Sequence, residues 1–114
     1  MELNTNSNDY INLEDALRRI GGNINLYKRL LGRFVEGNSL EPLEDALLSG
    51  DMEESARLIH TLKGVSANLS LIRIRDISID LEKAIKDSSD FSVLLDKLKQ
   101  AFSATLEIIA EITK

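Results

Sequence analysis

The stretch from Asp51 to Leu69 reads DMEESARLIHTLKGVSANL and decides the predicted fold, because its apolar residues recur at helical spacing. Asp51 followed by Glu54 forms a capping-box-like start, with Asp in place of Ser or Thr. At about 100° per residue, one broad face of this helix combines Ser55, Leu58, Ile59, Leu62, Val65, Ser66 and Leu69. We therefore expect an amphipathic helix that buries this face in a core.

Helical periodicity also dominates on both sides of this stretch. A short helix with the sequence LEDALRRI is predicted after Asn12, which can act as its N-cap, and the glycine pair at 21–22 ends it. A second helix begins near residues 23–25. The sequence GNS at 37–39 leaves open whether one long kinked helix or two helices lead to residue 50.

The stretch LIRIRDISIDLEKAIKD at 71–87 alternates as a strand would, but it also fits a helix. A helix is preferred because no partner strand exists elsewhere, and an isolated strand cannot satisfy its backbone. The last helix carries a bundle seam with alternating spacings of 4 and 3, made of Phe91, Leu95, Leu98, Phe102, Thr105, Ile109 and Ile112. The predicted fold is all-α, an antiparallel four-helix bundle with a short additional N-terminal helix.

Composition narrows the class of protein. The chain has 114 residues, 43% of them hydrophobic, and a formal net charge of -5, which predicts one folded domain and argues against nucleic acid as a partner. Residues 1–9 are polar and predict a flexible tail before the domain at 10–114. No apolar run approaches the roughly 20 residues of a membrane helix, and the N-terminus does not resemble a signal peptide. We therefore expect a cytoplasmic protein. With no Cys and one His, no metal site and no cofactor are expected.

The single histidine, His60, lies about 100° away from the predicted core stripe and should be exposed. Its neighbours along the same face, Ala56, Gly64 and Ala67, are all small, so another protein's backbone could approach closely. Gly64 lies inside the helix, where glycine costs about 1 kcal/mol relative to alanine and often marks close approach by another group. A tight helix–helix contact within the bundle is the alternative, but the position of Gly64 on the polar side argues against it.

The chemistry open to this face is limited. The chain has no Cys and no Gly-x-Ser-x-Gly elbow, so a hydrolytic triad is not expected. Nucleophilic catalysis by the imidazole remains, because a neutral ring nitrogen can accept a phosphoryl group and release it again. Lys63 and Arg57 lie three residues from His60 on either side and could attract such a group. Arg57 fits a solvated surface charge equally well.

The residues at 60–69, HTLKGVSANL, resemble the signature of histidine-containing phosphotransfer (HPt) domains. The preceding Ala56, the GD pair at 50–51, the segment ALRRIGGN at 16–23 and the pair Leu81-Glu82 match the same family pattern. The resemblance covers about residues 11 to 112. The chain departs from it in two places: Ser70-Leu71 replaces a frequent Gly-Ala, and Glu82 stands where Gln or another polar residue is frequent.

The resemblance implies that 10–114 is an HPt domain and acts as a phosphocarrier without kinase activity of its own. His60 would accept a phosphoryl group from a response-regulator receiver domain and pass it to another receiver, downstream of a hybrid sensor histidine kinase. Lys63 would stabilise the phosphoryl group, and any magnesium would belong to the receiver. A monomer is expected. Glu82 could accept a hydrogen bond from the imidazole or be an ordinary surface residue.

Partner contacts are expected at Ala56, Arg57 and Ala67, and the resemblance adds Lys28 and Arg29, for which plain solvation is the competing interpretation. A different class of function shares the same fold. In that alternative, the chain is a helical interaction module that binds a receiver or kinase domain without accepting phosphate.

Overall fold

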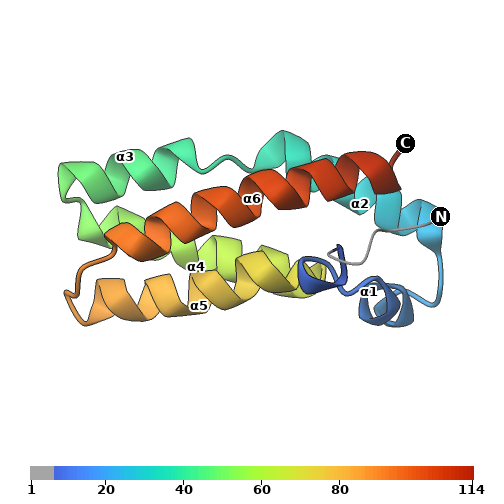
Figure 1. Ribbon diagram of the computed structural model, residues 1–114, viewed down its shortest axis with the longest axis horizontal. Coiled ribbons are helices and arrows are strands. Elements are labelled where there is room, and N and C mark those ends of the chain that lie inside the picture. The colour runs from blue at the N-terminus through green and yellow to red at the C-terminus, as the bar shows by residue number, and fades with distance from the viewer. Residues whose placement is uncertain (1–6) are drawn as a thin grey trace.

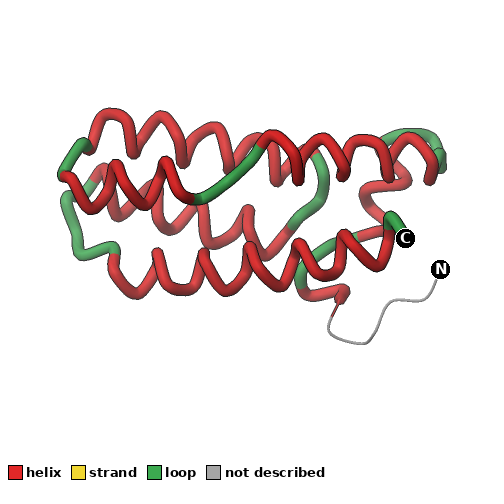
Figure 2. The backbone as a smooth tube through the Cα atoms, turned by 90° about the horizontal axis from the view of Figure 1, so that it is seen from above, coloured by secondary structure: helices red, strands yellow, loops and turns green. Residues whose placement is uncertain are grey.

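The computed structural model describes residues 7–114, and every regular element in this range is helical (Figure 2). The elements are a 3-10 helix η1 (Ser7–Asp9), followed by α1 (Leu13–Arg19), α2 (Ile24–Gly37), α3 (Glu41–Ser49), α4 (Met52–Asn68), α5 (Ile72–Lys86) and α6 (Ser92–Ile112). The predicted all-helical class is confirmed, including the helical interpretation of residues 71–87. Residues 1–6 of the expected tail lie outside the described residues. The last three residues of that segment, Ser7–Asp9, form the 3-10 helix, and Ser7 is buried.

The long helices lie lengthwise beside one another as a bundle (Figure 1). Helix α4 packs against α5 and α3, while α6 packs against α5 and α2. Helices α2 and α3 follow one another along the same edge of the bundle, and α1 lies at one end, against α2. The helix that carries His60 therefore has α3 on one flank and α5 on the other.

The structure answers the question left open at residues 37–39, because α2 and α3 are separate helices. Asn38 is extended, with φ −130° and ψ 130°, and its side-chain amide donates a hydrogen bond to the Phe34 carbonyl (3.1 Å). This bond satisfies one carbonyl at the end of α2. Pro42 lies in the first turn of α3, where its missing N–H is not needed.

The predicted faces meet in one core. In α4 the residues Ser55, Ile59, Leu62 and Ser66 are buried, and in α6 the whole seam from Leu95 to Ile112 is buried. The two buried serines donate to carbonyls of their own helix, Ser55 to Asp51 (2.7 Å) and Ser66 to Lys63 (3.0 Å). Their hydroxyls therefore add no unpaired polar group to this face.

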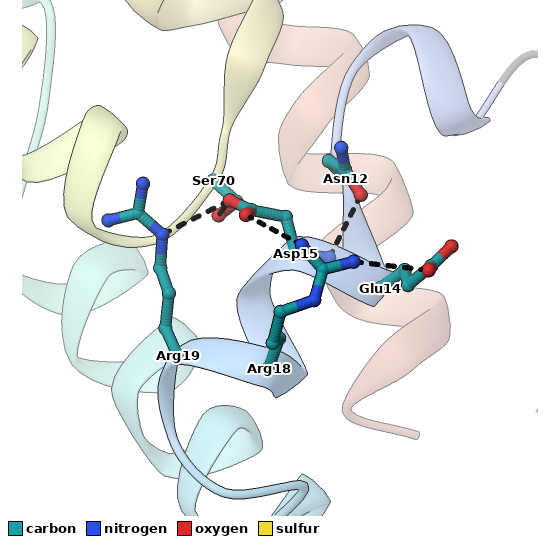
Figure 3. Close-up of polar contacts among 6 residues, drawn as sticks. All are labelled: Asn12, Glu14, Asp15, Arg18, Arg19 and Ser70. Atoms are coloured by element: carbon teal, nitrogen blue, oxygen red, sulfur yellow. Dashed lines mark hydrogen bonds and ion pairs between the residues drawn. The ribbon is translucent and has the colours of Figure 1, made fainter.

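The turn between α4 and α5 is held by the N-terminal helix (Figure 3). Ser70 is buried and has a φ of 57°, in the left-handed region where glycine is usual. Its hydroxyl donates to Asp15 Oδ2 (2.8 Å), and its carbonyl accepts from the Asn12 N–H (3.0 Å). Arg19 also pairs with Asp15 (3.1 Å). The serine that departs from the family pattern thus has a specific partner in α1.

Candidate functional site

Helix α4 presents His60 to solvent. The helix begins as predicted, since Asp51 Oδ1 accepts a hydrogen bond from the Glu54 N–H (3.1 Å). The burial of Ile59 and Leu62 fixes the phase of the helix and turns the next face outward. The His60 side chain is 72% exposed, so the expected exposure of the imidazole is confirmed.

Glu82 of α5 joins His60 to Lys63. Its Oε2 lies 2.9 Å from His60 Nδ1, and its Oε1 accepts a hydrogen bond from Lys63 Nζ (2.7 Å). The Glu82 side chain is only 12% exposed, while that of Lys63 is 31% exposed. Each carboxylate oxygen therefore has its own partner, and of the two interpretations of Glu82 the geometry favours the imidazole partner.

The electrostatics of this cluster determine which ring nitrogen is available. The hydrogen bond from Lys63 holds the pKa of Glu82 below its usual range, and the contact with His60 acts in the same direction, against the effect of burial. An ionised carboxylate can only accept hydrogen bonds, so the neutral imidazole carries its proton on Nδ1. Its Nε2 then keeps a free lone pair on an exposed ring.

Among the described residues, no neighbour requires glycine at position 64. It lies inside α4 with ordinary helical geometry, and a Cβ added there would meet nothing within 4 Å. The alternative of a tight helix–helix contact is therefore wrong. Gly64 is exposed, and Ala56 and Ala67 on the same face are half-buried. The side chains around the imidazole are therefore small and leave the ring accessible to another protein.

The remaining predicted residues do not join the cluster. Arg57 forms its ion pair with Glu54 on its own helix. Lys28 is half-buried and Arg29 is exposed on α2, and within residues 7–114 neither makes an ion pair or a hydrogen bond to the site.

The pairing of Lys63 with Glu82 was not predicted from the sequence. The signal was present, because His60 and Glu82 lie equally far from Leu71, and a hairpin of two helices turning there brings them level.

In the described part of the chain, no three His, Asp or Glu residues gather in a way that could hold a metal ion. None of the helices described is both long enough and apolar enough to cross a bilayer.

Comparison with known protein families gives one match. The Hpt domain family matches residues 30–108, which cover most of the chain and include α4 and α5. The chain therefore belongs to the Hpt domain family, the helical histidine phosphotransfer modules of phosphorelays. Searches of curated proteins and of solved structures gave no significant match.

Proposed function

We propose that this protein is a phosphocarrier of a two-component phosphorelay, in which His60 receives a phosphoryl group from the aspartate of one receiver domain and passes it to another. A hybrid sensor histidine kinase would supply the group upstream. The observation that carries the proposal is the exposed imidazole of His60, whose Nδ1 is bound to Glu82. In this proposal the chain does not load itself from ATP and depends on its partners for the phosphoryl group.

In the forward step, the Nε2 lone pair attacks the phosphorus of the aspartyl phosphate. A P–N bond forms, the P–O bond breaks, and the bonding electrons return to the aspartate as a carboxylate. The ring keeps its Nδ1 proton and becomes a phosphoimidazolium cation. The Glu82 carboxylate at 2.9 Å balances this new charge. The reverse sequence delivers the group to the second receiver.

The neighbours of His60 have separate proposed roles. Lys63 holds Glu82 in place at 2.7 Å, and its ammonium also favours a phosphoryl group on the adjacent ring. Gly64, Ala56 and Ala67 give clearance for a docked receiver. Arg57 belongs to the edge of that surface.

We propose that the fold is an antiparallel four-helix bundle. In this arrangement α2 and α3 together take the place of one of the four helices, and α1 is the additional helix. One exposed imidazole per chain needs no second copy. We propose a monomer that works in the cytoplasm, with its receivers.

The test is phosphotransfer from receiver domains. Each receiver domain of the source genome is phosphorylated with labelled acetyl phosphate and mixed with wild type or with His60→Gln. Wild type should gain label that is lost in acid but stable in base, as expected for phosphohistidine, and the variant should gain none. Equal labelling of the variant, or no transfer from any receiver, contradicts the proposal. Receiver binding without labelling would instead support the alternative of an interaction module.

A further inference from the structure

The open surface around His60 continues onto α5. Glu82 lies where α4 and α5 meet, with its carboxylate between His60 and Lys63. Ile79 and Lys86 lie three residues before and four residues after Glu82, so all three share one strip of the helix. Ile79 is 47% exposed although it is apolar, and Lys86 is exposed. This strip is called the α5 strip below.

Lys86 is a cation without a partner of its own. Within residues 7–114 it makes no ion pair and no hydrogen bond, but its charge reaches Glu82. Lys63 differs, because its ammonium is bound to Glu82. Lys86 is therefore the ammonium on this face that is free to meet an incoming anion.

Two lysines act on the carboxylate that binds His60, although the formal net charge of the chain is -5. Lys63 is bound to Glu82, and the charge of Lys86 acts on the same carboxylate. A receiver presents an anion at this point, because its aspartyl phosphate must come within reach of Nε2. A free ammonium beside the reaction centre complements that anion, and an exposed isoleucine beside it offers an apolar contact.

We propose that Ile79 and Lys86 form the α5 half of the docking surface for the phosphorylated receiver domain. This inference rests on the proposed function and adds to it the direction in which the partner extends from His60. Lys86 raises the rate of encounter through its charge, and Ile79 strengthens the docked complex. Neither residue touches Nε2, so both act on docking and not on the phosphoryl transfer step.

Two donors separate docking from chemistry. Phosphoramidate is a small donor that phosphorylates imidazole directly and needs no docking surface, whereas the cognate receiver loaded with acetyl phosphate does. The variants are Lys86→Glu and Ile79→Asp. Their matched controls lie on α6. Lys97→Glu makes the same change of charge as Lys86→Glu, and Lys97 lies in a groove with Ile77 and Asp80. Val93→Asp places the same carboxylate at another exposed apolar residue as Ile79→Asp does. Asp80 is two residues before Glu82, on the opposite side of α5.

We expect Lys86→Glu to slow transfer from the receiver by about tenfold at low salt, with a smaller deficit at high ionic strength because salt screens the charges. Ile79→Asp should slow it at all salt concentrations. Both variants should be labelled by phosphoramidate at the wild-type rate, and both controls should behave as wild type with either donor. Lys86→Gln, which only removes the charge, should fall between wild type and Lys86→Glu.

The inference is overturned if both α5 variants accept phosphate from the receiver as fast as their controls. In that case the proposed function still stands, provided that His60→Gln abolishes labelling. Slowed labelling by phosphoramidate would also overturn it, because that result places the residues in the chemistry. If no receiver labels the wild type, the proposed function fails and this inference fails with it.

Discussion

At the scale of single residues, one carboxylate decides how the imidazole is used. Glu82 binds Nδ1 of His60 with one oxygen and the Lys63 ammonium with the other, so neither oxygen is left to bind Nε2. A surface histidine without such a partner would exchange between two tautomers and rotate freely. The pair therefore sets both the orientation of the ring and the nitrogen that reacts.

Glu82→Gln should slow phosphorylation of His60 by about tenfold, because the amide oxygen still accepts from Nδ1 but carries no charge to balance the phosphoimidazolium. Glu82→Ala should be slower still, since it loses both charge and orientation. Labelling by phosphoramidate measures this without a partner protein. An alanine variant as fast as wild type would assign Glu82 a purely structural role.

Gly64→Ala should raise the free energy of unfolding by about 0.5–1 kcal/mol, because alanine favours the helix and its Cβ meets nothing within 4 Å. Urea titration measures the gain. Gly64→Leu should slow transfer from a receiver without slowing labelling by phosphoramidate.

Gly32 provides the control for the substitutions of Gly64. It lies inside α2, and an added Cβ there also meets nothing within 4 Å. Gly32→Ala should stabilise the protein similarly and leave transfer unchanged. If Gly64→Leu transfers at the wild-type rate, clearance for a partner does not explain the glycine.

At the scale of elements, the turn between α4 and α5 sets the relative position of His60 and Glu82. Both residues are on helices that meet at Ser70, and the left-handed conformation of Ser70 is held from outside by Asp15. Helix α1 therefore supports the turn between α4 and α5 as well as covering the end of the bundle. Its hydrogen bonds fix the turn that aligns the two helices of the site.

Ser70→Ala should lower the free energy of unfolding at pH 7 by about 1 kcal/mol, because it removes the buried hydroxyl that donates to the Asp15 carboxylate, while the left-handed conformation stays unfavourable. The hydrogen bond from Ser70 is also the main reason that the pKa of Asp15 lies below its usual range, followed by the pairing with Arg19. A lowered carboxyl pKa contributes stability above about pH 4, the value of the unfolded chain, and this contribution is lost as the pH falls through the folded-state pKa.

The difference between wild type and Ser70→Ala should therefore shrink as the pH is lowered below 4. Urea titrations at pH 7 and at pH 3 check this. A difference that is the same at both pH values would mean that the charge of Asp15 does not stabilise the turn.

At the scale of the whole molecule, much of the fold could be predicted because its helices bury continuous stripes. The phase of α4 follows from Ile59 and Leu62, and that phase alone places His60 outside. The separation of α2 from α3 could not be predicted, since Gly37 permits both outcomes and the deciding contact is the side chain of Asn38 on Phe34. The ordering of Ser7 depends on burial against the rest of the domain, which no local pattern reveals.

The candidate site was predictable to a similar degree. His60, Gly64 and their open surface follow from the pattern of one helix. The hydrogen bond from Lys63 to Glu82 requires the pairing of two helices. The hydrogen bond from Ser70 to Asp15 joins residues 55 positions apart. Contacts of this kind depend on packing between elements, so the sequence pattern of a single element does not contain them.

Among the described residues, two buried hydroxyls have no hydrogen-bond partner, those of Ser78 on α5 and Thr105 on α6. Thr105→Val keeps the shape and removes the unpaired group, so it should raise the free energy of unfolding by about 1 kcal/mol in urea titration. Thr61→Val is the matched control, because the exposed Thr61 hydroxyl already donates to the Arg57 carbonyl. A destabilised Thr105→Val would mean that this hydroxyl does find a partner.

The most direct test of the account uses the single histidine of the chain as its own probe. The protein is labelled with ¹⁵N-histidine, phosphorylated by its receiver, and observed by ¹H–¹⁵N NMR, which distinguishes the two ring nitrogens. The account predicts phosphate on Nε2 and a proton retained on Nδ1. A phosphate on Nδ1, or a ring that stays unmodified while the protein is labelled elsewhere, would contradict it.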